Sequence, residues 1–218
     1  MNCTDFRAFE SHYHPVAGVD EVGRGALFGA VVAASVILPP DRLATLHEAG
    51  VTDSKQLSPQ RRALLDNLIR DVAVDCQVGV ATVAEIDRTD ILEASLLAME
   101  RSLAALTVKP NHCLIDGNQP LRFRLIPPLP QTTVVKGDAM CLSIAAASIV
   151  AKVWRDRLMA ELEAQYPGYD LASNKGYGTP KHKAALSSLG YTDQHRRSFK
   201  LKGLGTSPIQ QLTILGDP

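Results

Sequence analysis

Cysteine is scarce in this chain, and its spacing argues against two kinds of stabilising site. The 218 residues contain four cysteines, none of which forms a C-x-x-C pair. Structural zinc sites usually use such close pairs, and disulfide frameworks are typical of short chains that are dense in cysteine. The sequence therefore favours a protein of a reducing compartment, and we expect it in the cytoplasm.

Long apolar runs and an excess of one charge are absent too. The apolar, uncharged run at residues 139–151 is too short to cross a bilayer, which takes about 20 residues. The N-terminus has no basic segment followed by an apolar one, so no signal peptide is expected. Basic and acidic residues number 23 each. These features predict a globular protein that has no membrane partner and no overall basic signature of a nucleic-acid binder.

The chain does contain an alternation of strand and helix patterns. Apolar and β-branched residues predict strands at 16–22, 30–38, 72–83, 112–115 and 132–135. Helical periodicity and capping residues predict helices at 58–70, 92–106, 139–163 and 179–189. This order indicates an α/β layer fold with a mixed sheet. We expect one domain over residues 1–203 and a flexible polar tail over 204–218.

Carboxylates lie at the ends of three predicted strands. Asp20 and Glu21 end the first, while Asp116 and Asp138 follow the last two. If these strands are neighbours, the acids converge at one edge of the sheet, where α/β proteins commonly place their sites. Crowded carboxylates cannot all ionise without counter-charge, which Mg²⁺ or Mn²⁺ supplies. Two such ions would activate a water and stabilise the leaving oxygen of a phosphodiester.

Each acid also has a simpler interpretation. Asp116 opens an Asp-Gly-Asn turn sequence, and Asp138 can serve as the N-cap of the following helix. Asp20 and Glu21 are adjacent, and neighbours on a regular strand point to opposite faces. Both can serve one site only if the strand bends or bulges, which the glycines that follow would permit.

The turn after the first two acids consists of Gly23, Arg24 and Gly25. Two glycines around an arginine let the backbone approach a phosphate or sugar, with a bidentate donor beside it. Between residues 175 and 202 seven basic residues face one acid, Asp193. This strip is either a solvated face or a surface for nucleic acid. Together with the carboxylates, the turn indicates phosphoryl-transfer chemistry on a nucleic acid.

The order and spacing of these motifs resemble bacterial ribonuclease HII. The resemblance covers residues 16–199 and rests on AGVDEVGRG (17–25), DSKQLS (53–58), EIDRTDILEASLLAM (85–99), LIDGN (114–118), KGDAMCLSIAAASIVAKVWRD (136–156), KGYGT (175–179) and HRRSF (195–199). It implies a ribonuclease H-like fold, with a five-stranded mixed sheet flanked by helices and a C-terminal helical extension. It also implies an endonuclease that hydrolyses the RNA strand of RNA–DNA hybrids. This enzyme would incise 5′ of single ribonucleotides in duplex DNA with Mn²⁺ or Mg²⁺, leaving 3′-hydroxyl and 5′-phosphate ends.

The resemblance also assigns roles residue by residue. The family's metal-binding acids match Asp20, Glu21, Asp116 and Asp138. The family's turn that contacts the ribonucleotide and adjoining phosphates matches Gly23, Arg24 and Gly25, and its junction-sensing tyrosine matches Tyr177. A phenol can hydrogen-bond the 2′-hydroxyl, the group that distinguishes RNA from DNA. We expect a monomer.

Other basic residues are candidates for substrate contact on charge alone. Lys55 is either a phosphate contact or part of a surface turn. Arg196 and Arg197 fit binding to a duplex backbone, which is electrostatic and blind to sequence. His182 and His195 lack metal-ligand spacing, so we interpret them as surface or packing residues.

The loop after the turn departs from the family's usual GRGPLAGPVV. Ala26 and Ala30 stand where the family has prolines, and Phe28 replaces a small residue. Losing proline predicts a less rigid loop beside the site. No metal ligand is affected by these changes.

Three further readings bear on the function. The sister family, ribonuclease HIII, would carry an extra N-terminal domain, and Asp20 lies too near Met1 for one. An alternative of another class is a non-catalytic hybrid-binding protein, against which the complete set of acids argues. The segment 211–215 (QLTIL), from Gln211 to its last residue Leu215, resembles peptides that dock into the bacterial sliding clamp.

Overall fold

The computed structural model describes residues 3–199, and a five-stranded mixed sheet forms its centre. The sheet has the order β3-β2-β1-β4-β5, built from β1 (Val16–Val22), β2 (Val31–Ile37), β3 (Asp75–Ala81), β4 (His112–Asp116) and β5 (Gln131–Val134). Strand β2 runs antiparallel to β1 and β3, whereas β4 runs parallel to β1 and β5. The predicted α/β fold with a five-stranded mixed sheet is confirmed.

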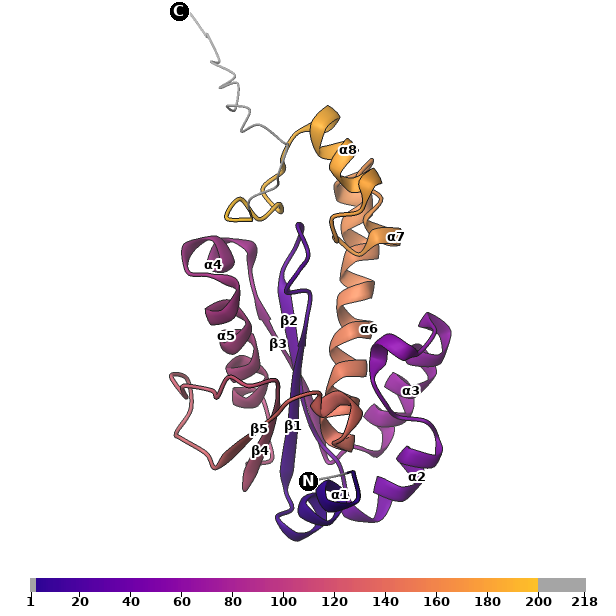
Figure 1. Ribbon diagram of the computed structural model, residues 1–218, viewed down its shortest axis with the longest axis vertical. Helices are drawn as coiled ribbons and strands as arrows, with labels where there is room; N and C mark the ends of the chain where they lie inside the picture. The colour runs from indigo at the N-terminus through magenta and orange to yellow at the C-terminus, as the bar shows by residue number, and fades with distance from the viewer. Residues whose placement is uncertain (1–2, 200–218) are drawn as a thin grey trace, which may run out of the picture.

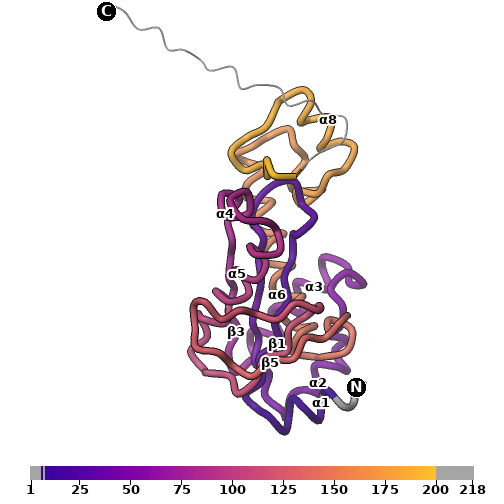
Figure 2. Tube along the Cα trace, turned by 60° about the vertical axis from the view of Figure 1, so that its left-hand side comes forward, coloured from indigo at the N-terminus to yellow at the C-terminus, as the bar shows by residue number. Residues whose placement is uncertain are grey.

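Helices cover both faces of the sheet (Figure 1). They are α1 (Cys3–His12), α2 (Leu43–Glu48), α3 (Pro59–Val72), α4 (Val83–Arg88), α5 (Ile91–Ala104), α6 (Leu142–Gln165), α7 (Leu171–Asn174) and α8 (Pro180–Leu189). Helix α5 packs on one face, and α6 with α3 on the other, which gives two apolar core clusters. Helices α7 and α8 extend the fold beyond the sheet at the far end of α6 (Figures 1 and 2).

Two glycines let the helices approach the sheet closely. A Cβ atom at Gly18 would lie 2.1 Å from the main chain of Ser143 in α6. A Cβ atom at Gly79 would lie 2.1 Å from the carbonyl oxygen of Ala98 in α5. Because real Cβ contacts are never this short, only glycine fits at either position. The two layers therefore place the first turns of α6 directly against β1.

Helix α6 begins at Leu142, three residues later than predicted. Lys136 adopts the left-handed conformation with φ of 57°, and residues Gly137–Ala139 form a 3-10 turn instead. The main-chain N–H of Ser143 donates to Oε1 of Glu10 in α1 at 2.9 Å. The interpretation of Asp138 as the helix N-cap is therefore wrong, because an acid from a distant helix serves that end.

Several short helices were not predicted from the sequence. They are α1, α2, α4 and α7. The proposed tail at 204–218, including Gln211 and Leu215, lies outside the described residues. Within residues 3–199, no helix combines the length and apolar character that crossing a membrane would require.

Candidate active site

Three parallel strands bring their last residues to one edge of the sheet. Asp20 lies near the end of β1, Asp116 is the last residue of β4, and Asp138 follows β5 in the 3-10 turn. The register pairs Val19 with Ile115, so Asp20 and Asp116 come next on adjacent strands. Topology alone thus gathers acids that are far apart in the sequence.

Asp20 and Glu21 reach this edge from a regular strand. Asp20 pairs with Ala34 and Glu21 with Ala33, without an inserted residue, so β1 has no bulge at these acids. The side chain of Asp20 is buried on the α6 side, where it hydrogen-bonds Ser148. That of Glu21 lies on the opposite side, in a pocket that α5 helps to line. Both carboxylates sense the charge of Asp116 because the pairing of β1 with β4 stops just before it.

The carboxylates repel one another strongly enough to perturb their titration. Burial raises the pKa of Asp20 well above its ordinary value, and the charges of Glu21 and Asp116 raise it further. Burial raises the pKa of Glu21 against the opposing charge of Arg24, and Asp116 adds to the rise. Burial, with the charge of Asp138, also raises the pKa of Asp116. A cluster of this kind needs positive charge to ionise fully.

Two exposed basic side chains supply part of that charge. Nζ of Lys55 lies 3.2 Å from Oδ2 of Asp138, and its side chain is 78% exposed. Nη1 of Arg24 lies 3.4 Å from Oε1 of Glu21, and its side chain is 49% exposed. Over residues 3–199, no three His, Cys, Asp or Glu side chains are arranged to hold a metal ion. In this structure the acids are neighbours, and Asp138 and Glu21 form ion pairs with Lys55 and Arg24.

The hydroxyls of Ser148 and Ser54 form a buried pair next to Asp20. Oγ of Ser148 in α6 lies 2.9 Å from Oγ of Ser54, and both side chains are buried. Ser148 therefore links Asp20 to the loop that carries Lys55. Ser148 was not predicted as a site residue, although Ser148, Lys152 and Arg155 form a polar stripe at helical spacing in the long helix.

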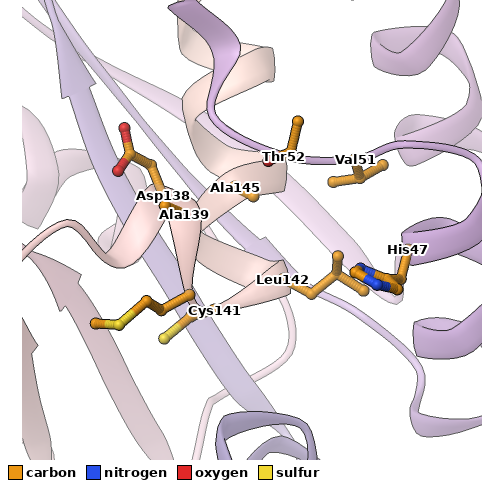
Figure 3. Close-up of a pocket in the computed structure, with 9 residues that line it drawn as sticks. His47, Val51, Thr52, Asp138, Ala139, Cys141, Leu142 and Ala145 are labelled. Atoms are coloured by element: carbon orange, nitrogen blue, oxygen red, sulfur yellow. The ribbon is translucent and has the colours of Figure 1, made fainter. Parts of the chain in front are cut away.

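Asp138, the last of the four acids along the chain, lies beside a small pocket at the start of α6. Figure 3 shows the carboxylate of Asp138 turned away from the side chains of His47, Val51 and Leu142, which line this pocket. Asp138 lines this pocket, while its carboxylate points away from those three side chains. Asp138 instead faces Lys55, with which it forms its ion pair.

The glycine-arginine-glycine turn and Tyr177 lie together. Ala26 and Tyr177 form an antiparallel bridge, and the N–H of Leu27 donates to the carbonyl of Gly176 at 2.8 Å. A Cβ atom at Gly25 would lie 3.9 Å from Cε1 of Tyr177. Tyr177 is 36% exposed. A nucleotide bound on the turn would therefore be within reach of the phenol.

The unusual residues after the turn restrain it. The N–H of Ala26 donates to the carbonyl of Gly23 at 3.2 Å, a bond that proline cannot make. Phe28 is fully buried, and its ring centroid lies 4.8 Å from that of His195 and 5.4 Å from that of Tyr166. These contacts hold Ala26 and Phe28 in the loop that the loss of two prolines predicted to be less rigid.

The two candidate arginines after α8 have different environments. Arg196 is 1% exposed, and its guanidinium binds the carbonyls of Gly29 and Arg24, each at 2.9 Å. The Arg196 side chain therefore lies inside the protein and not on its surface. Arg197 is exposed, and its guanidinium lies 5.8 Å from the ring centroid of Tyr191.

Two histidines that we interpreted as surface or packing residues are buried. Nδ1 of His195 accepts from the N–H of Thr192 at 3.0 Å, so its proton is on Nε2. That nitrogen lies 3.1 Å from Nε2 of His182, whose Nδ1 is 3.0 Å from the carbonyl of Tyr177. Burial lowers the pKa of His195 to about 3, with the charges of His182 and Arg197 adding. The neutral pair supports the main chain of Tyr177 from the protein interior.

Comparison with known proteins decides the family. The family model described as Ribonuclease HII matches residues 17–202. The chain belongs to the ribonuclease HII family. It is therefore a ribonuclease H of type 2, a hydrolase with endoribonuclease activity.

Curated relatives and solved structures agree with this membership. Ribonuclease HII of Trichodesmium erythraeum is 61% identical over 183 residues, covering 84% of this chain and 85% of the relative. That of Synechococcus elongatus is 52% identical over 213 residues, covering 97% and 96%. Ribonuclease H2 from Pyrococcus horikoshii superposes with a TM-score of 0.75 at 30% identity, covering 85% of this chain and 93% of that one. A chain of the PCNA:RNase HII complex from Archaeoglobus fulgidus gives a TM-score of 0.72 at 27% identity, covering 88% and 98%.

Proposed function

We propose that this ribonuclease HII incises duplex DNA on the 5′ side of single ribonucleotides and cleaves the RNA strand of hybrids, by a two-metal mechanism. The observation that carries the proposal is the group of acids around Asp116, which lies beside the glycine-arginine-glycine turn at one sheet edge. A non-catalytic hybrid-binding protein would have no need of mutually repelling carboxylates. Removal of embedded ribonucleotides and of RNA primers in the cytoplasm follows from this activity.

The acids are the residues that would hold Mn²⁺ or Mg²⁺. They offer only oxygen donors, which these ions prefer, and their raised pKa values indicate a shortage of positive charge. Bound divalent ions supply Lewis-acid activation of water and stabilisation of the leaving 3′ oxygen. The protein's part is to orient these carboxylates, and Ser148 fixes that of Asp20. Lys55 and Arg24 leave their ion pairs and become free to contact phosphates.

Recognition of the ribonucleotide falls to the turn and to Tyr177. The main chain of Gly23, Arg24 and Gly25 contacts the ribose and the adjoining phosphates, and the Tyr177 hydroxyl meets the 2′-hydroxyl. Lys55 and Arg197 add exposed positive charge to the duplex-binding surface. We propose a monomeric enzyme whose catalytic domain spans residues 1–203.

Cleavage of defined duplexes tests the function directly. We expect purified protein to cut a DNA duplex with one embedded ribonucleotide when Mn²⁺ or Mg²⁺ is present, leaving 3′-hydroxyl and 5′-phosphate ends. An all-DNA duplex of the same sequence is the control and stays intact. Tight binding of the ribonucleotide duplex without any cutting would favour the non-catalytic alternative.

Metal binding should stabilise the protein more at neutral than at acidic pH. A raised carboxyl pKa favours the metal-free fold at low pH, and this benefit is lost as the pH rises through the folded-state pKa. Metal requires deprotonated ligands, so protons compete with it. We expect saturating Mn²⁺ to raise the unfolding midpoint by about 5 °C at pH 7.5 and by much less at pH 5.5. Thermal unfolding with Mn²⁺ and with EDTA measures this; equal shifts at both pH values would contradict it.

Tyr177→Ala should reduce cleavage at isolated ribonucleotides more than cleavage of continuous hybrids. The substitution removes the hydroxyl and the ring beside the turn, and we expect a loss of about tenfold or more at a single ribonucleotide. Tyr177→Phe keeps the ring, including its contact with Arg155 at 5.7 Å, and isolates the role of the hydroxyl. The ratio of kcat/KM on the two substrates is the readout, and an unchanged ratio in both variants would contradict the role of Tyr177.

The segment 211–215 is proposed to contact the sliding clamp. A solved relative was captured as a complex of PCNA with ribonuclease HII, and Gln211 with Leu215 fits a short clamp-docking peptide. A peptide spanning residues 207–218 should bind immobilised bacterial clamp. No binding at roughly 0.5 mM peptide, a concentration that detects even interactions of about 4–5 kcal/mol, would end this proposal.

A further inference from the structure

Two arginines lie buried beneath the glycine-arginine-glycine turn. Arg155 from α6 is 0% exposed, and Arg196 from the segment after α8 is 1% exposed. A buried charge is costly to desolvate and is normally paired with an opposite charge. Among the ion pairs formed by residues 3–199, none includes Arg155 or Arg196. Asp156 and Asp87 favour the two charges electrostatically but form no ion pair with them.

Main-chain carbonyls take all the hydrogen bonds that these guanidinium groups make. Arg155 donates to the carbonyl oxygens of Phe28 and Ala30 at 3.1 Å and of Lys175 at 2.8 Å. Arg196 donates to Gly29 and Arg24, while its Nη2 is buried and has no hydrogen-bond partner in the described part of the chain. A carbonyl carries only a partial charge. Within residues 3–199, neither charge therefore has a carboxylate within ion-pair distance.

Both charges lie directly under the proposed substrate contacts. A Cβ atom at Gly23 would lie 2.3 Å from Nε of Arg155, so the guanidinium occupies the space next to that glycine. Cζ of Arg155 is 5.7 Å from the ring centroid of Tyr177, and Nη1 of Arg196 is 2.9 Å from the carbonyl of Arg24. Burial lowers the pKa of Arg196 to about 9, and the charge of Arg155 contributes to the lowering. The fold thus holds two buried guanidinium charges close together, immediately below the turn.

We propose that a backbone phosphate of the bound duplex, held on the Gly23, Arg24 and Gly25 turn, is the counter-anion of Arg155 and Arg196. The two arginines are positioning residues, because they fix the carbonyl of Arg24 and those of residues 28–30 just after the turn. They also add positive potential beneath the turn. A charge in a poorly screened interior acts over several ångströms. The proposal rests on the proposed function only in that the ligand is a nucleic-acid duplex.

Because the proposed ligand is a phosphate, the proposal predicts how these arginines affect affinity for different duplexes. DNA and RNA carry the same phosphates, so these arginines raise affinity for every duplex alike. Tyr177, by contrast, affects only ribonucleotide-containing substrates. The arginines should also change KM much more than kcat, because they do not touch the acids at the sheet edge.

Three variants of Arg196 separate charge from geometry. Arg196→Met removes the charge, Arg196→Gln removes it but keeps an amide for the carbonyls, and Arg196→Lys keeps it. In EDTA, we expect the Met and Gln variants to bind an all-DNA duplex and a ribonucleotide-containing duplex about tenfold more weakly, equally for both, which is about 1.4 kcal/mol. The Lys variant should retain most of the affinity. With Mn²⁺, KM should rise by a similar factor while kcat changes less than about threefold.

Arg101→Met is the matched control. Arg101 also donates to a main-chain carbonyl, that of Val80 at 2.7 Å, but it has a carboxylate partner in Glu85 at 2.6 Å. We expect its duplex affinity to equal that of the wild type. Wild-type affinity in Arg196→Gln, or equal losses in the Gln and Lys variants, would overturn the proposal. The Gln variant serves if Met prevents folding. A wild type that binds duplexes in this way but does not cut at ribonucleotides would contradict the proposed function and leave this inference intact.

Discussion

Asp20→Asn is expected to abolish most of the nuclease activity and to leave the fold intact. Asparagine has the same shape, so the contact with Ser148 on α6 can remain. The substitution removes one of the charges proposed to hold the divalent ions. We expect kcat to fall by about 10³-fold or more, which is about 4 kcal/mol of transition-state stabilisation. Cleavage of a duplex with one ribonucleotide under single-turnover conditions measures this loss.

In EDTA, Asp20→Asn should be as stable as the wild type or more stable. Burial raises the pKa of Asp20, with repulsion from Glu21 and Asp116 adding, so its ionised form strains the metal-free fold at neutral pH. Removing that charge should give an unfolding midpoint in EDTA equal to or above that of the wild type, with a smaller Mn²⁺ shift. Asp41→Asn is the control, since the Asp41 side chain is 77% exposed and is not one of the proposed metal ligands. Near wild-type turnover by Asp20→Asn would refute the metal assignment.

Gly23→Ala is expected to cost about 2–5 kcal/mol of stability and to weaken substrate binding. Gly23 has a φ of +94°, and an added Cβ would lie 2.3 Å from Nε of Arg155. Forcing an alanine into the positive-φ region costs about 1–2 kcal/mol, and overpacking adds about 1–3 kcal/mol. Arg155 is buried and holds three carbonyls, so it has little freedom to move away. Urea denaturation gives the loss of stability, and KM gives the displacement of the turn.

Gly25→Ala is the matched control within the same motif. Gly25 is not among the positive-φ glycines, and its nearest neighbour would be Cε1 of Tyr177 at 3.9 Å. We expect a loss of stability of under about 1 kcal/mol. Equal losses for the two substitutions would show that Arg155 does not dictate glycine at position 23. The comparison also separates a glycine required by packing from one that leaves room for a ligand.

The sequence by itself determined the sheet, the motifs and the family. Strand patterns predicted β1 with the bounds seen in the structure and placed the others to within a few residues, because alternation and apolar runs are local signals. The acids were also identifiable from the sequence, since carboxylates directly after strands are unusual enough to stand out. Helix α1 and the late start of α6 were not, because Glu10 caps α6 from a position far away in the chain.

Only the tertiary structure decided what the buried polar residues do. Arg196 and Arg197 are adjacent in a basic strip, yet one is buried under the turn and the other is exposed. Asp20 and Glu21 reach the same acid from opposite faces of a regular strand, because β4 ends beside them. A linear pattern records residue type and spacing, whereas burial and charge compensation depend on which distant segments pack together. The division is physical: local propensities set the elements, and long-range packing sets the electrostatics of the site.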